Sequence, residues 1–279
     1  MERLQAAIEK ARQQRESGVR RRKTLFSGAS APAPQTRSDD CEAAWAGLAE
    51  ISLRPRVLRR NRLVAHESGP EAAPHDVLRT RLLHQARSHG WRRIGIASPD
   101  SGCGKSTTAA NLAFALGRQR DIRTMVLDFD LRRGGLAKVL GQKPKHSMAE
   151  VLEGTRPFAE HGVRHAKTVA FGLGRGGVRQ PSEILQSRQT LETLSALEET
   201  YRPDLVLFDL PPLMATDDNY GFLSHVDAAL IVVAAERTRL ERVDVAERQI
   251  AELTNVMGIV LNMARYTDGA YGYDYGYYG

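Results

Sequence analysis

The sequence predicts an α/β fold, with a mostly parallel sheet and helices on both of its faces. Short apolar runs alternate with helical patterns from residue 92 onward, and a glycine-rich turn joins the first run to the helix that follows it. Such alternation is typical of parallel sheets that helices cover on both sides. Ligands of these sheets bind at the carboxyl ends of the strands, so we expect the functional site there.

Each element of this sheet is predicted from its own pattern. The predicted strands are apolar runs bounded by glycine or polar residues, and the predicted helices carry apolar residues at helical spacing. The strands are expected at residues 92–98, 124–130, 168–173, 204–209, 229–235 and 256–262, and the helices at residues 76–88, 105–119, 181–200 and 240–253.

The N-terminal part of the chain has a different composition. Residues 1–16 have the apolar spacing of a short helix, residues 27–36 are rich in Ser, Ala and Pro, and residues 51–63 are basic and expected to be loosely extended. We expect low order up to about residue 70. The predicted organisation is a partly disordered basic arm at residues 1–70, a folded domain at residues 71–265 and a flexible tail at residues 266–279.

The positive charge of the chain lies in its N-terminal third. The 279 residues carry a net charge of +7. Residues 1–90 hold 17 Lys and Arg against 10 Asp and Glu, whereas residues 91–279 hold 23 of each kind. A basic extension on a neutral domain fits an anionic partner, either the inner face of a membrane or a nucleic acid, and a solvated arm is the simpler alternative.

Several features favour a cytoplasmic location. The longest strongly apolar run, near residues 226–235, is too short to cross a bilayer, and the polar N-terminus has no stretch like a signal peptide. Cys41 and Cys103 are the two cysteines, and they provide neither a disulfide framework nor a thiolate zinc site. His161 and His165 are spaced as on a helix, where we expect a solvated face rather than a metal site.

A phosphate-binding loop is predicted where the first strand meets its helix. Glycines let backbone N–H groups turn toward phosphate oxygens, and a helix that starts at Lys105 directs its positive end at the same anion. Lys105 would bind the β- and γ-phosphates and the Ser106 hydroxyl would bind Mg²⁺, so ATP and Mg²⁺ are the expected cofactors. Pro99 replaces the first glycine of the usual GxxxxGK pattern. The predicted binding residues are Ser101, Gly102, Cys103, Gly104, Lys105, Ser106 and Thr107.

Acidic residues stand at the ends of two later predicted strands. Asp128 and Asp130 follow one apolar run, and Asp209 ends another. Neighbouring strands of a parallel sheet end at one edge, so these carboxylates should converge with Lys105 as catalytic residues. Asp209 and Asp130, with Ser106, are predicted to organise Mg²⁺, and Asp128 is the candidate to orient or deprotonate an incoming hydroxyl. Capping of the loops that follow is the structural alternative.

The C-terminus is rich in tyrosine. The last 14 residues hold six of the eight tyrosines, interleaved with glycine, and such a segment cannot build a core. Two explanations remain open. The tyrosines are accessible phosphate acceptors, or they form an adhesive segment that serves assembly through aromatic contacts. The candidate acceptors are Tyr266, Tyr271, Tyr273, Tyr275, Tyr277 and Tyr278.

Taken together, these motifs resemble those of the bacterial tyrosine kinases of capsule and exopolysaccharide synthesis, within the P-loop ATPases of the MinD and ParA type. The likeness runs from about residue 76 to the C-terminus. It rests on ASPDSGCGKSTTAANLA, on VLDFDLRR with Arg132 in register, on VLFDLPPLMATDD with Asp217 in register, on QPSEILQS, and on GIVLN, whose Asn262 is implied to lie near the nucleotide base. The resemblance also implies that Arg132 belongs to the cofactor site.

The resemblance implies a kinase that phosphorylates the tail of a neighbouring protomer and thereby regulates polysaccharide polymerisation and export. It further implies self-association, a cognate tyrosine phosphatase, and a membrane-spanning co-polymerase that activates the kinase and recruits it to the inner face of the membrane. Nucleic acid is not an expected partner. Two motifs depart from the family. Ala73, Asp76 and Arg79 occupy its Glu-x-x-Arg-x-x-Arg positions for ring assembly, and Leu210 replaces a small hydroxyl residue.

Two other functions stay open on the sequence. The first is a partitioning or positioning ATPase of the same superfamily, which the basic N-terminal third would suit. Those relatives usually carry a signature lysine five residues before the P-loop lysine, where this chain has Asp100. The second is a non-catalytic regulator of polysaccharide export that binds ATP and transfers nothing. Phosphotyrosine on the tail would distinguish the kinase from both.

Overall fold

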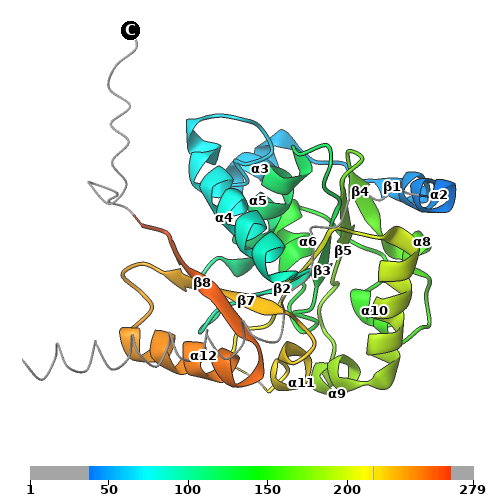
Figure 1. Cartoon of the computed structure of the whole chain (residues 1–279). Coiled ribbons are helices and arrows are strands. Elements are labelled where there is room, and N and C mark those ends of the chain that lie inside the picture. Colours follow the sequence, from blue (N-terminus) through cyan, green and yellow to red (C-terminus); the bar gives the residue numbers. More distant parts are fainter. Residues whose placement is uncertain (1–37, 216, 265–279) are drawn as a thin grey trace, which may run out of the picture. The chain divides into compact units, whose positions relative to one another are not determined.

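The computed structural model describes residues 38–215 and 217–264, which lie within one unit of the chain (Figure 1). The helix expected at residues 1–16, the linker at residues 27–36 and the tail tyrosines lie outside the described residues. Within the described part of the chain, no helix combines the length and the apolar character that a membrane crossing needs.

An eight-stranded sheet organises this unit, in the order β1-β4-β5-β3-β6-β2-β7-β8. Neighbouring strands run parallel, except that β4 pairs antiparallel with β5. The predicted mostly parallel α/β fold is therefore confirmed. The strands are β1 (Ala49–Glu50), β2 (Arg93–Ala97), β3 (Thr124–Asp128), β4 (Val163–His165), β5 (Val169–Gly172), β6 (Leu205–Asp209), β7 (Ala228–Ala234) and β8 (Asn255–Asn262).

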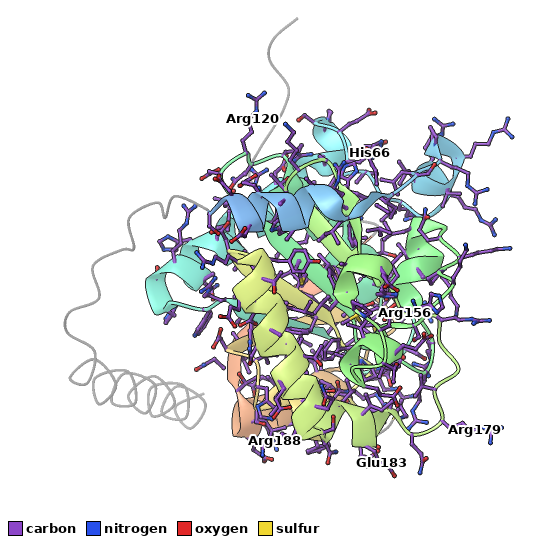
Figure 2. All side chains as sticks on the ribbon, turned by 90° about the vertical axis from the view of Figure 1, so that its right-hand side faces the viewer. His66, Arg120, Arg156, Arg179, Glu183 and Arg188 are labelled. Carbon is purple, nitrogen blue, oxygen red and sulfur yellow. The ribbon has the colours of Figure 1, made fainter. Side chains whose placement is uncertain are left out.

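Helices cover both faces of the sheet. Figure 1 shows α4 and α5 on one side and α10 and α12 on the other, and each side has its own apolar core. Charged side chains lie outside, as Arg120, Arg179 and Arg188 do in Figure 2. The helices are α2 (Asp39–Gly47), α3 (Pro55–Arg60), the 3-10 turn η1 (Pro70–Ala72), α4 (Ala73–His89), α5 (Lys105–Gly117), α6 (Gly135–Leu140), α7 (Met148–Leu152), α8 (Phe158–His161), α9 (Pro181–Gln186), α10 (Arg188–Tyr201), α11 (Tyr220–Leu223) and α12 (Leu240–Leu253).

The central strands are buried on both faces, which explains their continuous apolar sequences. Every residue of β3, β6 and β7 is buried. Alternate residues of β3 enter different cores: Val126 packs with α5, whereas Met125 and Leu127 pack on the opposite face. Just beyond β3, Phe129 lies with its ring centroid 4.9 Å from that of Phe208 and 4.5 Å from that of Phe222. This aromatic cluster anchors the segment that carries the predicted acidic residues.

The expectation of low order up to residue 70 is wrong for residues 38–70. Cys41 and Trp45 of α2 are buried against α10, and Trp45 Nε1 donates to the carbonyl of Tyr201 at 2.6 Å. β1 then extends the sheet beside β4. The stretch expected to be loosely extended contains α3, whose Leu58 is buried. Long-range contacts order this segment, and its basic composition gave no sign of them.

Two further expectations need correction. The single helix expected at residues 181–200 is two helices, α9 and α10, because Ser187 breaks it and caps α10 by accepting the N–H of Thr190 at 3.1 Å. The expected solvated helix face at His161 and His165 is also wrong. His161 ends α8 and is buried, and His165 lies in β4, so the two side chains do not share a helix.

Candidate functional site

Two glycines shape the loop between β2 and α5. Gly102 and Gly104 have φ angles of 79° and 87°, in the left-handed region that glycine tolerates. A Cβ on Gly104 would also collide with the amide of Asn262, whose Nδ2 donates to the carbonyl of Cys103 at 2.9 Å. The end of β8 therefore supports this loop directly, and residue 104 must be glycine for the two to fit.

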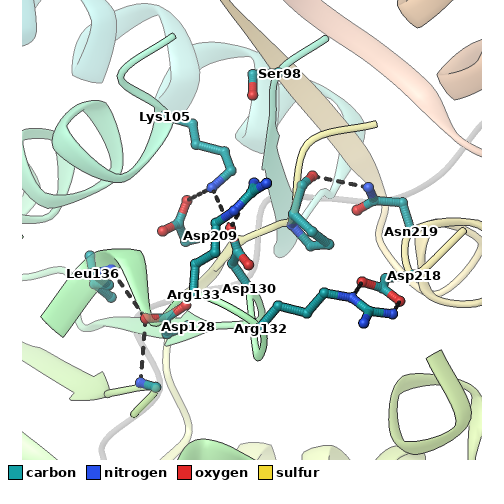
Figure 3. Close-up of polar contacts among 12 residues, drawn as sticks. Ser98, Lys105, Asp128, Asp130, Arg132, Arg133, Leu136, Asp209, Asp218 and Asn219 are labelled. Atoms are coloured by element: carbon teal, nitrogen blue, oxygen red, sulfur yellow. Dashed lines mark hydrogen bonds and ion pairs between the residues drawn. The ribbon is translucent and has the colours of Figure 1, made fainter. Parts of the chain in front are cut away.

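Lys105 begins α5 and projects among carboxylates (Figure 3). Its Nζ donates to Asp130 Oδ2 at 3.2 Å and lies 3.7 Å from Asp209 Oδ1. Arg133 Nη1 lies 4.0 Å from the same oxygen of Asp130. The side chains of Lys105, Asp130 and Asp209 are all buried. The structure thus brings the predicted lysine and two of the predicted carboxylates into one site.

Strand register brings the third carboxylate and the serine to the same place. Asp128 at the end of β3 pairs directly with Asp209 at the end of β6, and Asp209 in turn pairs with Ile96 of β2. A Cβ placed on Gly135 would lie 2.5 Å from Ser106 Oγ and 3.6 Å from Asp209 Oδ2. The start of α6 therefore closes over Ser106 and Asp209, and the absence of a side chain at residue 135 leaves them room.

Burial and mutual repulsion govern the ionisation of this cluster. Burial, followed by the nearby Asp209, raises the pKa of Asp128 well above its usual range. Burial also raises the pKa of Asp209, although Lys105 opposes that rise. Burial lowers the pKa of Lys105, but Asp209 and Asp130 outweigh it, and this pKa lies above its ordinary value. Lys105 therefore stays protonated, whereas the raised pKa values of Asp128 and Asp209 oppose ionisation of both carboxyl groups at once.

The backbone fixes Asp128 in place. Its Oδ2 accepts the N–H of Leu136 at 3.1 Å and the N–H of Gly174 at 3.3 Å, whereas its Oδ1 accepts no hydrogen bond from the described residues. One oxygen of this carboxyl group is thus occupied with holding the start of α6 and the loop after β5. The other oxygen is the one available to a ligand.

Arg132 is bound by an acidic residue that the sequence analysis did not select. Asp217, which is in register with the family motif, is exposed, and its buried neighbour Asp218 binds Arg132. Arg132 donates from Nε to Asp218 Oδ2 at 2.8 Å and from Nη2 to Asp218 Oδ1 at 2.9 Å. The sequence shows two adjacent aspartates that could pair with Arg132, but the conformation of the loop decides which of them faces inward.

Asp100, which occupies the signature-lysine position of the partitioning ATPases, is held by α12. Its carboxylate accepts from Arg242 Nε at 2.8 Å and from Arg242 Nη2. Cys103, one of the predicted nucleotide-binding residues of the loop, is buried, and its Sγ lies 3.7 Å from Thr238 Oγ1. Sequence reasoning missed both Arg242 and Thr238, because each approaches the loop from a segment more than a hundred residues away.

The altered ring-assembly positions are engaged within the chain. Asp76 of α4 accepts from Arg79 at 3.1 Å and also from Arg118 of the segment after α5. Arg79 Nη1 further donates to the carbonyl of Ala115 at 3.1 Å. These side chains therefore tie α4 to α5.

The cluster fits a phosphate-bound Mg²⁺. Two buried carboxylate oxygens, Asp128 Oδ1 and Asp130 Oδ1, accept no hydrogen bond from the described residues, and the buried carboxylate of Asp209 has only the Ser106 hydroxyl and Lys105, whose Nζ lies 3.7 Å away. Buried oxygens of this kind call for a cation or a donor. Among the described residues, no group of three or more His, Cys, Asp or Glu is arranged to hold a metal alone. Mg²⁺ needs no such group, because one or two carboxylates together with phosphate oxygens and water suffice.

A known protein family accounts for this arrangement. The family described as "ParA: NUBPL iron-transfer P-loop NTPase" matches residues 91–278, which hold the glycine loop, Lys105 and all three carboxylates. The chain belongs to the ParA family of P-loop NTPases. In such proteins the loop binds a nucleoside triphosphate, so the site described above is a nucleotide site. Membership does not choose the reaction, because one fold serves many functions.

This ParA-family chain is similar in sequence to bacterial kinases, as its motifs predicted. It is 30% identical over 197 residues to the tyrosine-protein kinase ptk of Acinetobacter johnsonii, which covers 70% of this chain and 26% of that protein. It is 26% identical over 205 residues to the tyrosine-protein kinase YwqD of Bacillus subtilis, covering 72% of this chain and 84% of that protein. The chain therefore spans only about a quarter of the length of the first of these relatives.

The fold has a solved counterpart. The kinase domain of the Escherichia coli tyrosine kinase ETK superposes with a TM-score of 0.64 and 24% sequence identity, covering 74% of this chain and 80% of that one. This likeness shows the fold that the two chains share.

Proposed function

We propose that this chain is an ATP-dependent protein-tyrosine kinase that phosphorylates the tyrosine cluster of a second copy. One observation carries the proposal: Lys105 lies buried between Asp130 and Asp209 behind the glycine loop, and Asp128 pairs in register with Asp209. An ATPase switch needs the lysine and the metal-binding carboxylates. A further buried carboxyl group beside them suits transfer to a hydroxyl. The kinase names of the relatives support the same choice.

The phosphate-handling residues have distinct tasks in this proposal. Lys105 and the N–H groups of the loop hold the phosphates, and Arg132 and Asn262 complete the nucleotide site. Ser106, Asp130 and Asp209 hold Mg²⁺, which when bound neutralises charge on the phosphoryl group that is transferred. Burial of the cluster excludes water, so these charges act on the phosphates more strongly than they would in bulk water.

Asp128 orients the acceptor tyrosine and takes its proton. Its Oδ2 is held by two backbone N–H groups, so the carboxyl group cannot rotate away, and its unbonded Oδ1 is the oxygen that receives the proton. A pKa raised by burial suits a group that must accept a proton near neutral pH. Asp130 is assigned to the metal because its buried Oδ1 accepts no hydrogen bond from the described residues.

The tail tyrosines Tyr266–Tyr278 are the proposed acceptors, and the proposed consequence is control of polysaccharide polymerisation and export. Each added phosphate brings a charge of about −2, so a modified cluster would repel its neighbours and disperse an assembly. A membrane-spanning co-polymerase is the proposed activator and the means of recruitment to the inner face of the membrane. A tyrosine phosphatase would reverse the reaction.

The test is mass spectrometry of the tail after expression with and without Lys105→Met. Phosphate on several tail tyrosines is expected, and the variant should lack it. The matched control is Lys167→Met, which removes an exposed lysine outside the site. Repeating the measurement in the native host supplies any missing activator. ATP hydrolysis without phosphotyrosine there would favour a positioning ATPase, and ATP binding without turnover would favour a nucleotide-sensing regulator.

A further inference from the structure

Eight exposed cations gather where α3 packs beside α6. We call this surface the basic face, and it consists of Arg54, Arg56, Arg59, Arg60, Arg62, Lys138, Lys143 and Lys145. Five of them come from α3 and its ends, in the segment whose order the composition did not predict. The other three come from α6 and the loop that follows it.

Side-chain hydrogen bonds join the two halves of the basic face. Asn61 Nδ2, just after α3, donates to the carbonyl of Val139 at 2.7 Å, and Arg54 Nη2 donates to the carbonyl of Gly141 at 3.3 Å. Gln142 Nε2 returns a bond to the carbonyl of Ser52 at 2.8 Å. These contacts make the basic face one fixed surface, although its halves lie about 80 residues apart in the chain.

The two segments that carry these cations offer no charge of opposite sign. Residues 51–66 and residues 131–149 contain no Asp or Glu at all. Two acidic residues flank the first segment: Glu50, which pairs with Arg164 at 3.8 Å, and Glu67, which lies 3.4 Å from His66. Within the described part of the chain, none of the eight cations forms an ion pair. Unbalanced like charges held on one surface create a field that attracts an anionic partner.

We propose that the basic face binds the surface of an anionic phospholipid bilayer. Clusters of four to eight Lys and Arg are typical of such binding, because an anionic membrane gathers cations without requiring fixed spacing. Nucleic acid fits less well. Proteins that bind single strands typically combine a basic groove with aromatic side chains on which bases stack, and neither residues 51–66 nor residues 131–149 contain Phe, Tyr or Trp.

This binding does not depend on the proposed kinase activity. The eight cations lie outside the nucleotide site, so a chain without kinase activity would still bind, and a kinase that fails to bind would still transfer phosphate. The face would hold the unit directly against the membrane, in addition to any protein that recruits it.

The experiment is co-sedimentation of the full chain with vesicles of phosphatidylcholine, with and without phosphatidylglycerol as about a third of the lipid. Binding should require phosphatidylglycerol and weaken as salt rises. Changing Arg56, Arg59 and Arg60 together to Gln should weaken it about 100-fold, since each cation contributes about fivefold. Changing Lys138, Lys143 and Lys145 together to Gln tests the other half of the face and does not depend on the folding of α3.

The matched control changes Arg87, Arg239 and Arg248 to Gln, which alters the net charge equally at exposed positions of α4, just before α12 and within α12. It should bind nearly as well as the unaltered chain. Equal losses in the control and in the two face variants would overturn the proposal, as would full binding by both face variants. Tighter binding to duplex DNA than to the anionic vesicles at the same salt would instead assign the face to nucleic acid.

Discussion

Arg132 and Asp218 form a forked ion pair that joins the segment after β3 to the loop after β6, with both carboxylate oxygens of Asp218 engaged at 2.8 and 2.9 Å. The two partners differ in exposure: the Asp218 side chain is 1% exposed and that of Arg132 is 37% exposed. The buried carboxylate therefore depends on a guanidinium group that reaches it from the surface.

Substitution of Arg132 should reveal what that pair contributes. Arg132→Ala leaves the buried Asp218 carboxylate without both guanidinium bonds and should cost about 3 kcal/mol of unfolding free energy. Arg132→Lys keeps the charge but loses the fork, so it should cost about 1 kcal/mol. Urea unfolding measures both values. If the two variants lose equal unfolding free energy, the positive charge at residue 132 does not contribute to stability.

Gly104→Ala should damage the nucleotide site beyond its backbone penalty. The comparison is Gly177→Ala, because Gly177 has a φ of 81° and open space around it, so it carries the same penalty, about 1–2 kcal/mol, without a collision. Gly104→Ala adds the collision with Asn262 and should lower Tm by several degrees more, with at least about a tenfold loss of ATP affinity. Calorimetry and ATP titration check this. Adding Asn262→Ala should restore part of the stability, and no recovery would contradict the steric explanation.

Trp45 should prove essential to the folded unit, although sequence patterns placed it in a weakly ordered arm. Its ring is buried, with the Arg123 guanidinium 5.0 Å from the ring centroid, and its Nε1 donates to Tyr201. Trp45→Ala should cost about 3–4 kcal/mol, and Trp45→Phe, which keeps most of the ring, about 1 kcal/mol. Chemical denaturation measures both. A loss below about 0.5 kcal/mol for Trp45→Ala would mean that α2 is not docked.

His161 should make stability fall in mild acid. Burial lowers the pKa of His161 to about 4, below the value of about 6.5 in the unfolded chain. The neutral imidazole is accommodated above pH 6.5, and stability is lost as pH falls from about 6.5 toward 4, because the unfolded state binds the proton more readily. The loss should reach about 3 kcal/mol, and His161→Gln should remove this part of the pH dependence. Urea unfolding between these pH values tests it, and unchanged slopes in the variant would contradict the assignment.

The sequence predicted the sheet well because its strands are buried on both faces and its helices have one clear apolar side. The helix expected at residues 240–253 has the bounds of α12, and the acidic residues expected at strand ends meet where parallel register must bring them. Asp128, Asp130, Asp209 and Lys105 could be selected because strand, turn and helix signals surrounded them.

The features that the sequence did not reveal depend on partners far along the chain. Cys41 and Trp45 are buried against α10, where both donate to the carbonyl of Tyr201, more than 150 residues further along the chain. α3 has a single buried residue among its arginines. Periodicity reports local burial and is silent about such contacts. The choice of Asp218 over Asp217 depends on one turn of a loop, which neither composition nor spacing encodes.

The hydrogen bond from Asn262 to Cys103 joins residues 159 positions apart and sets a limit on where this chain can be shortened. Removing the residues after Ala264 leaves the bond in place. A chain that ends at Ile259 instead lacks Asn262, and therefore lacks the side chain that lies against Gly104. If a shortened protein fails to bind ATP, the failure can be attributed to the missing tail only when the cut falls after residue 262. An earlier cut also removes the side chain that supports the phosphate loop.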